Sequence, residues 1–216
     1  MAIATSKIEF NDQSSIGNGS SARRALDLLL AIPTVILLLP LFGLIALWIK
    51  FDSHGAVFFL QERVGLGGKL FRIFKFRTMV PEAEQKGKQI TIGRDPRITV
   101  CGHFLRKYRI DELPQLFNVI KGEMSIVGPR PEVPRYVALY SDEQRQILGF
   151  RPGITSPASI EFSNESEILA QQSDPENYYR TELMPAKIAK DLTYSRRATA
   201  WSDCLIIVKT VVRLIG

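Results

Sequence analysis

Residues 28–49 read LLLAIPTVILLLPLFGLIALWI. The run carries no charged residue, and it is longer than the ~20 apolar residues that a helix needs to cross the hydrocarbon core of a bilayer. Arg23 and Arg24 precede it, and Lys50 follows it. A cleaved signal peptide does not fit, because residues 1–22 are polar and no small-residue cleavage site lies behind the run. We therefore expect a membrane-embedded helix over residues 23–50.

Two prolines interrupt this run, Pro33 and Pro40. Each removes a backbone donor and clashes with the preceding turn, so a straight helix is not expected. A break at Pro40 gives pieces of roughly 18 and 15 Å, each too short for a ~30 Å hydrocarbon core. Together they form a re-entrant hairpin that leaves Arg23, Arg24 and Lys50 on one face, where cytoplasmic anionic lipid attracts them. A kinked helix that spans the membrane once is the alternative, and the residue pattern permits both.

The remaining sequence predicts a tail and one further domain. Residues 1–22 are rich in serine, glycine and asparagine, which predicts a flexible tail. Residues 51–216 are enough for one cytoplasmic domain. Aromatic and β-branched runs within 57–79, separated by a glycine turn at 65–68, predict a β-hairpin. Helices are expected at 102–108, 111–120, 141–148, 164–192 and 201–215, with a short helix near 82–88.

The last of these helices has apolar residues at helical spacing, with Lys209 and Arg213 elsewhere. This pattern fits a helix lying at a membrane interface, and equally an ordinary amphipathic helix packed on a core. The expected fold class is thus α+β and mostly helical. It joins a re-entrant membrane helix-break-helix to a small domain with a short β-hairpin and amphipathic interfacial helices.

The charge and cysteine content narrow the chemistry. The formal net charge is +6 and the pI is about 9.4, so the partner is expected to be anionic: nucleic acid, lipid headgroups or a phosphorylated small molecule. Cys101 and Cys204 lack a metal-binding spacing with each other or with His54 and His103, so we interpret both thiols as reduced packing residues.

A basic aromatic stretch follows the membrane segment. Its cations could bind RNA, form a solvated strand face or hold a diphosphate. The cations of this stretch are Arg63, Lys69, Arg72, Lys75 and Arg77, and the aromatic residues are Phe71, Phe74 and Phe76.

Asp111 and Glu112 form an adjacent acidic pair at the start of a predicted helix. Asp111 could simply be the N-cap of that helix. Alternatively, Asp111 is a nucleophile that forms an acyl-phosphate, and Glu112 binds a hard divalent cation through oxygen. Because adjacent side chains of a helix point about 100° apart, the two do not face each other as an acid and base pair.

Rigid loops present further cations. Arg130 is fixed between Pro129 and Pro131, which suits bidentate contact with phosphate oxygens, although a salt bridge that fixes the loop is the simpler interpretation. Arg151 likewise precedes a Pro-Gly turn. Arg106 and Arg109 lie just before Asp111 and would keep the acidic pair ionised at neutral pH.

These features occur together in an ordered set of motifs. They are Arg23-Arg24-Ala25-Leu26-Asp27, Gln61-Glu62-Arg63-Val64-Gly65, Phe74-Lys75-Phe76-Arg77-Thr78-Met79, Asp111-Glu112-Leu113-Pro114-Gln115-Leu116, Val127-Gly128-Pro129-Arg130-Pro131 and Arg151-Pro152-Gly153-Ile154-Thr155. From about residue 23 to the C-terminus, the chain resembles the bacterial sugar transferase family, the monotopic phosphoglycosyl transferases. Its short N-terminal tail is similar to the minimal form of that family.

The resemblance implies an activity, a place and substrates. A sugar-1-phosphate would pass from a UDP-sugar to undecaprenyl phosphate, with release of UMP, through a covalent phosphosugar on Asp111. Glu112 would bind Mg²⁺. The site would lie on the cytoplasmic face of the bacterial inner membrane, nucleic acid would not be a partner, and downstream glycosyltransferases would extend the product. The expected phosphate-binding residues are Lys75, Arg77, Arg106, Arg130 and Arg151.

Two departures from the family pattern stand out. Many members have serine before the breaking proline, whereas this chain has Leu39-Pro40 and an additional Pro33, so the expected re-entrant topology depends on Pro40 and on the family resemblance. The Gly-Ile-Thr-Gly-Trp stretch of the family is replaced here by Gly153-Ile154-Thr155-Ser156-Pro157-Ala158-Ser159, which bears on sugar preference or on contacts with the acceptor. The rival interpretations are a membrane-anchored adaptor that binds a polyanion and a single-pass phosphohydrolase that uses Asp111.

Overall fold

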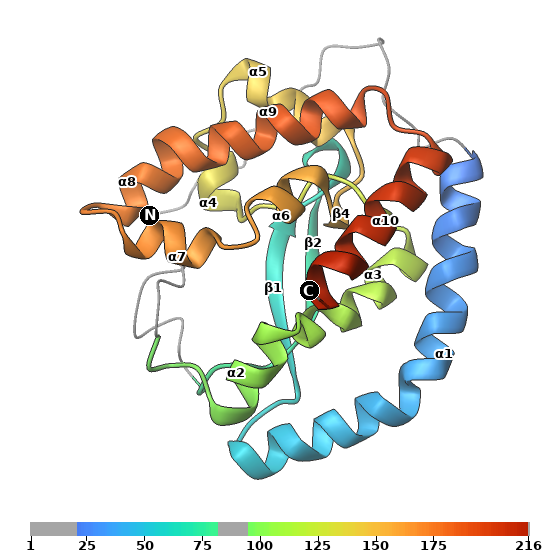
Figure 1. Cartoon of the computed structure of the whole chain (residues 1–216), viewed down its shortest axis with the longest axis vertical. Coiled ribbons are helices and arrows are strands. Elements are labelled where there is room, and N and C mark those ends of the chain that lie inside the picture. Colours follow the sequence, from blue (N-terminus) through green and yellow to red (C-terminus); the bar gives the residue numbers. More distant parts are fainter. Residues whose placement is uncertain (1–20, 82–94, 216) are drawn as a thin grey trace.

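The computed structural model of the chain describes residues 21–81 and 95–215. The predicted tail, apart from its last two residues, lies outside them, and so does the short helix predicted near 82–88. The described residues form a mostly helical α+β fold, as the sequence predicted, and they contain two small sheets (Figure 1).

Helix α1 (Ser21–Asp52) contains both Pro33 and Pro40 and continues through them. Figure 1 shows that it bends, so that its first half runs along one side of the molecule and its second half runs beneath it. The helix predicted to break at Pro40 is therefore continuous through that residue, and α1 bends along its length. By length and composition alone, α1 is the one helix in the described part of the chain that could cross a membrane.

Both ends of α1 are bound to the rest of the molecule. At its start, Arg23 pairs with Asp203 of α10 (Ala200–Ile215) across 2.5 Å. At its end, Asp52 accepts a hydrogen bond of 3.0 Å from the backbone N–H of Cys101 in α2 (Val100–Lys107). Between the two ends, α1 packs one face on the domain through Ala31, Val35, Phe42, Ile45 and Ile49.

The predicted hairpin is confirmed. Strands β1 (Phe58–Val64) and β2 (Leu70–Phe76) pair antiparallel, and the short helix η1 (Leu66–Gly68) connects them. Gly67 and Gly68 adopt positive φ angles of 65° and 74°, which glycine tolerates at no steric cost. Asn118 fixes β2 from outside, since it accepts from the N–H of Phe74 and donates to the carbonyl of Arg72.

The next segment differs in one respect from its prediction. A 3₁₀ helix, η2 (Ile110–Gln115), precedes α3 (Leu116–Lys121), which ends at Gly122 in the left-handed region. Arg109 is the residue that caps η2, with φ 53° and ψ 22°. The prediction of Asp111 as the N-cap is therefore wrong, because the turn begins one residue earlier and Asp111 lies inside it.

A second, parallel pair of strands was not predicted. It joins β3 (Ser125–Val127) to β4 (Gly153–Thr155). The helix predicted at 164–192 is divided, because Asp174 starts a new turn at Pro175. The other helices are α4 (Pro134–Val137), α5 (Asp142–Arg145), η3 (Gln146–Gly149), α6 (Pro157–Glu161), α7 (Glu165–Ala170), α8 (Pro175–Tyr178), η4 (Tyr179–Leu183) and α9 (Met184–Ser195).

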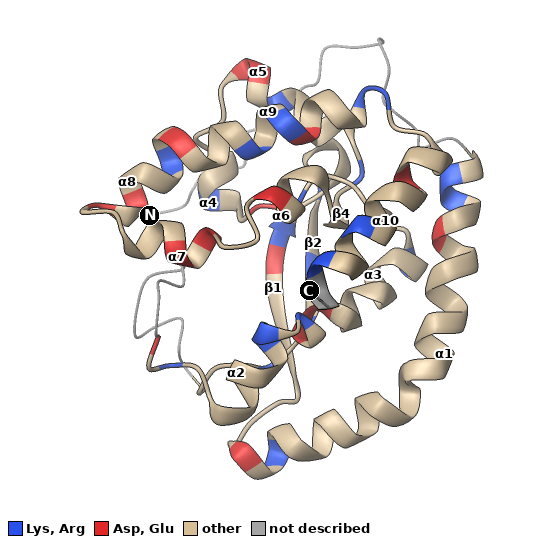
Figure 2. Ribbon diagram, in the orientation of Figure 1, with Lys and Arg blue, Asp and Glu red and all other residues tan. Residues whose placement is uncertain are grey.

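Large apolar side chains remain exposed on three helices. Much of α1 is without charge between its two ends (Figure 2), and its outward face is rich in exposed leucine. In α10, Trp201 is 74% exposed and the valines of the same helix are also exposed, whereas Ile206 is buried, so the helix packs on the domain and still presents apolar side chains on its outer side. Helix α2 adds exposed Val100 and Phe104.

Candidate active site

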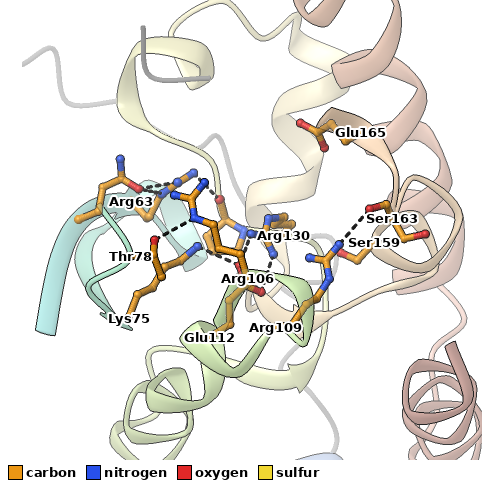
Figure 3. Close-up of polar contacts among 12 residues, drawn as sticks. Arg63, Lys75, Thr78, Arg106, Arg109, Glu112, Arg130, Ser159, Ser163 and Glu165 are labelled. Atoms are coloured by element: carbon orange, nitrogen blue, oxygen red, sulfur yellow. Dashed lines mark hydrogen bonds and ion pairs between the residues drawn. The ribbon is translucent and has the colours of Figure 1, made fainter. Parts of the chain in front are cut away.

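The acidic pair lies in a cavity of about 340 Å³, called here the Asp111 cleft. Its walls come from β1, the end of β2 with Thr78 and Met79, α2, η2 and the loop after β3. Segments distant in sequence thus converge on Asp111 and Glu112, and their cationic side chains point into one space (Figure 3).

The backbone before the acidic pair is unusual. A φ of 53° at Arg109 is the left-handed conformation, which non-glycine residues rarely adopt and which costs on the order of 1 kcal/mol. Pro114 then fixes φ within η2. These constraints hold Asp111 and Glu112 in a tight turn that directs them to different neighbours.

Glu112 is held by two cations. Its Oε1 accepts from Arg130 at 2.5 Å and from Lys75 at 2.9 Å, and its Oε2 accepts from Arg130 at 3.2 Å. Burial alone would raise the pKa of Glu112, but the charges of Arg130 and Lys75 together outweigh it and hold that pKa well below its usual range. The same pairing raises the pKa of Arg130, so both groups stay ionised.

Asp111 has a different environment. Its carboxylate is buried, and no donor among residues 21–81 and 95–215 forms a hydrogen bond with it. Burial, followed by the negative charge of Glu112, raises the pKa of Asp111 to about 6, although Lys75 and Arg106 oppose this shift. Asp111 is therefore mostly ionised at neutral pH and has lone pairs that none of the described residues occupies.

The loop that carries Arg130 is fixed from two sides. Asp191 of α9 accepts from the backbone N–H of Arg130 and, at 2.9 Å, from that of Ala158. On the other side, Arg63 donates to the carbonyl of Pro131 at 3.1 Å. The loop is rigid, as its two prolines predicted, and the arginine is positioned before any ligand binds.

The structure brings some of the predicted site residues together. Lys75, Arg106 and Arg130 all line the Asp111 cleft with the acidic pair. Arg106 is oriented by a 2.8 Å hydrogen bond from its Nε to the hydroxyl of Thr78.

Arg77 and Arg151 lie elsewhere. Arg77 donates to the carbonyl of Ser53 at 2.6 Å, so its guanidinium contacts the chain just after the end of α1. Arg151 lines a separate small cavity with Arg24 and Asp27. Pro40, the predicted membrane break, lies in the middle of α1 and far from these groups in sequence. Neither arginine lines the Asp111 cleft.

The cleft also contains cations that the predicted set omitted. Arg63, Arg97 and Arg109 line it. Arg63 belongs to the same basic stretch as Lys75. It also lies two residues after Gln61 on β1, and because residues two apart share a strand face, both side chains point into the cleft. Arg109 was expected beside the acidic pair from its place two residues before Asp111, whereas for Arg97 the sequence holds no comparable signal.

A second cavity adjoins the first. It measures about 350 Å³ and is called here the Glu165 cavity. The two cavities share Gln61, Arg63, Arg109 and Arg130 in their walls. A ligand with two parts could therefore occupy both while Arg130 lies between them.

The acidic pair suits Mg²⁺ chemically. A carboxylate offers about four lone-pair positions, and the contacts to Arg130 and Lys75 use three of those on Glu112. Mg²⁺ usually takes one or two protein carboxylates with substrate phosphates and water. No cluster of three or more His, Cys, Asp or Glu that could hold a metal occurs in the described residues. A cation here would need substrate oxygens to complete its shell.

A buried carboxylate surrounded by arginines is typical of proteins that bind and transfer phosphoryl groups, since such transfer depends on positioning and on cations that neutralise charge. Comparison with known sequences identifies the family: the pattern of the bacterial sugar transferases matches residues 19–216. The chain belongs to the bacterial sugar transferase family.

Three relatives illustrate this kinship. The chain is 40% identical, over 88% of its length, to the UDP-N-acetylgalactosamine-undecaprenyl-phosphate N-acetylgalactosaminephosphotransferase of Aeromonas hydrophila. It is 41% identical, over 90% of its length, to the UDP-glucose:undecaprenyl-phosphate glucose-1-phosphate transferase of Xanthomonas campestris pv. campestris. It spans only 42% and 39% of those two proteins. It spans 85% of the exopolysaccharide production protein ExoY of Rhizobium meliloti (strain 1021), at 35% identity over 89% of its own length.

Proposed function

We propose that this protein is a phosphoglycosyl transferase, which moves a sugar-1-phosphate from a UDP-sugar to undecaprenyl phosphate and releases UMP. The observation that carries the proposal is the state of Asp111: a buried carboxylate, surrounded by cations, whose oxygens accept no hydrogen bond from the described residues. Relatives named for this reaction, or for exopolysaccharide production, support the same activity.

The reaction takes two displacements at one phosphorus atom. In the first, an oxygen of Asp111 attacks the phosphorus that bears the sugar, the bond to the bridging oxygen breaks, and UMP leaves with that electron pair. In the second, an oxygen of undecaprenyl phosphate attacks the same phosphorus and the bond to Asp111 breaks. The products are the free carboxylate and a polyprenyl diphosphate sugar, which downstream glycosyltransferases would extend.

The cations of the cleft give each displacement its electrostatic support. A UDP-sugar carries its negative charge on the diphosphate, and a carboxylate must approach it. Lys75, Arg106 and Arg130 neutralise the oxygens of the diphosphate and stabilise the departing UMP. Arg130 is pre-positioned by its loop, so little reorganisation accompanies binding.

Glu112 has a supporting role in this scheme. It keeps Arg130 and Lys75 in fixed places through the contacts described above. When Mg²⁺ is bound, Glu112 would hold it together with phosphate oxygens, and the ion would neutralise further charge on the diphosphate.

We also propose that α1 enters one leaflet and returns to the same face. Both of its ends contact the one folded domain, through Arg23 and Asp203 at the start and Asp52 and Cys101 at the end. A helix that spans a bilayer has its ends on opposite sides of a ~30 Å hydrocarbon core, so the two contacts favour the re-entrant arrangement. With flanking basic residues on the cytoplasmic side, the cleft faces the cytoplasm, where UDP-sugars are made.

The exposed apolar residues support a membrane-surface location. The outward face of α1, the tip of α2 and the outer face of α10 would all lie in the interface. Trp201 and Tyr108 are both exposed, and amphipathic rings of this type favour the headgroup level. Arg106 of the cleft belongs to α2, so the Asp111 cleft is close to the surface that a lipid-bound acceptor can reach.

Intact-mass measurement tests the proposed reaction. The full chain in lipid nanodiscs is incubated with UDP-sugars in the absence of undecaprenyl phosphate. We expect UMP release and a mass increase of one phosphosugar, both lost in Asp111→Asn and both kept in Asp142→Asn, which removes an exposed carboxylate of α5. Adding undecaprenyl phosphate should discharge the adduct.

Each rival function predicts a different product. Release of inorganic phosphate, without transfer to the lipid, would identify a phosphohydrolase. Salt-sensitive binding of RNA that Asp111→Asn leaves unchanged, with no UMP from any donor, would identify an adaptor and overturn the proposal.

A further inference from the structure

The Glu165 cavity contacts the Asp111 cleft, yet the chemistry proposed for Asp111 does not use it. We propose that this cavity is the subsite for the sugar of the donor, and that Glu165 and Ser159 recognise its hydroxyl groups. This inference rests on the proposed function. It adds where the sugar lies and which residues select it.

The two displacements require the sugar to bind in a region separate from the one that UMP and the lipid phosphate occupy. In each displacement at phosphorus the attacking and leaving oxygens are roughly in line. UMP leaves from the side opposite Asp111, and the lipid phosphate must later attack from that same side, because Asp111 is then the leaving group. UMP and the acceptor therefore share one region in turn, and the sugar needs a separate region that it does not leave between the two steps.

The two cavities match this division. The Asp111 cleft includes Arg106 of α2, a helix with exposed apolar residues, so it is open to a lipid-bound acceptor. The Glu165 cavity has no lining residue from α1, α2 or α10, the three helices proposed to contact the membrane. Figure 3 shows Ser159, Ser163 and Glu165 on the other side of Arg109 and Arg130 from Lys75.

The charges that line the Glu165 cavity are largely paired within its own wall. Lys187 donates to Oε2 of Glu165 at 2.5 Å, and Arg63 pairs with Glu132 at 3.2 Å. Tyr179 donates its hydroxyl proton to Glu132 as well. Paired charges favour an uncharged, polar ligand over a second phosphate, and the volume of about 350 Å³ lies in the ~300–1,000 Å³ range of small-molecule sites.

Two groups in the wall remain available to sugar hydroxyls. No described residue donates to Oε1 of Glu165, which can therefore accept from a hydroxyl group. The hydroxyl of Ser159 accepts from that of Ser156 at 3.0 Å, which leaves its own proton free to donate. Ser159 lies in the segment where this chain departs from the family pattern, so the segment has a position from which it can set sugar preference.

The lining also contains aromatic rings, which suit the apolar faces of a pyranose. Tyr136 and Tyr179 pack together with their ring centroids 5.0 Å apart, and Phe150 and Phe162 contribute further surface. Pockets for small molecules commonly combine aromatic side chains with a few polar groups, because the polar groups fix the orientation of the ligand and the rings fill the volume.

Donor selectivity tests the inference. UMP release would be measured with UDP-glucose and UDP-galactose, and with their N-acetyl forms, so that each pair differs only at one hydroxyl. In Glu165→Gln we expect kcat/KM for the preferred donor to fall about tenfold or more relative to its epimer, since the charged acceptor of one hydrogen bond is lost. The KM for undecaprenyl phosphate should not change.

Matched variants separate recognition from structural effects. Glu167→Gln removes an exposed carboxylate from the same helix and should leave both epimer ratios unchanged. Should Glu165→Gln fail to fold, Ser159→Ala tests the same subsite, with the same readout. If the ratio of kcat/KM between the two epimeric donors is the same in the wild-type protein and in both cavity variants, the sugar subsite is overturned. UMP release by these proteins would still support the proposed function. No UMP from any donor in wild-type protein would overturn both.

Discussion

Replacing Gly153 with alanine should weaken the support of Arg130. Gly153 begins β4, and a Cβ added there would lie 2.1 Å from the backbone nitrogen of Gly128 and 2.6 Å from its Cα and carbonyl oxygen. Backbone atoms have no rotamer by which to yield. Since ordinary contact begins at 3.4 Å, the two segments must separate by about 1 Å or more.

The cost of this separation follows from what joins the segments. Gly153 donates to the carbonyl of Pro129 at 2.9 Å, and Gly128 donates to that of Thr155 at 3.0 Å. Loss of one such bond costs about 1 kcal/mol, and overpacking adds about 1–3 kcal/mol. We expect the free energy of unfolding to fall by about 2–4 kcal/mol and the Tm by about 5–15 °C. Because Arg130 moves with its loop by about 1 Å, UMP release should fall about 100-fold.

Thermal unfolding followed by circular dichroism, together with the rate of UMP release, measures both effects. Gly149→Ala is the matched control, because a Cβ at Gly149 meets nothing within 4 Å. That variant should unfold within about 2 °C of the wild-type protein and keep its rate. If Gly153→Ala behaves like Gly149→Ala in both assays, the close approach of β3 and β4 does not position Arg130, and the reasoning is refuted.

Three further predictions concern the acidic pair. UMP release should rise with pH through a midpoint of about 6, because Asp111 must be deprotonated to attack and burial has raised its pKa; a flat profile between pH 5 and 7 in the single-turnover rate would contradict this. Glu112→Gln removes a negative charge that raises the pKa of Asp111, so the midpoint of the pH profile should move to lower pH. The free energy of unfolding of this variant should fall by about 2–3 kcal/mol, because Lys75 and Arg130 lose their common partner. Chelation with EDTA should abolish UMP release and Mg²⁺ should restore it, whereas persistent activity in EDTA would exclude a metal role for Glu112.

Local sequence patterns predicted the elements that depend on nearby residues. The hairpin follows from β-prone runs on either side of a glycine turn, and its strands fall within the predicted segment. The β3–β4 pair was missed because each strand has only three residues and its partner lies far along the chain. Such non-local pairing leaves no periodic signal in a single sequence.

Arg77 and Arg151 were predicted to bind phosphate but lie outside the cleft, and both lie beyond the ends of strands. Lys75 and Arg77 are two residues apart, so they would share a face if β2 continued. The strand ends at Phe76, and the guanidinium of Arg77 donates to the carbonyl of Ser53, just after α1 ends. Arg77, a predicted phosphate ligand one residue beyond the strand, therefore lies outside the cleft that Lys75 lines. Arg151 precedes β4 and faces α1 in the same way.

The turn that holds Asp111 and Glu112 shifts the pKa values of the two adjacent carboxylates in opposite directions. In a 3₁₀ helix successive side chains point about 120° apart, so two neighbours cannot share one environment. Glu112 faces Arg130 and Lys75, and its pKa is held low; Asp111 faces the open cleft, and its pKa is raised. A group that anchors cations must stay ionised, and a nucleophile must keep lone pairs free, so the divided pair meets both needs of the proposed transfer. The left-handed residue Arg109 determines where this turn begins, and that determinant has no signature in the sequence, because nothing about an arginine predicts a positive φ.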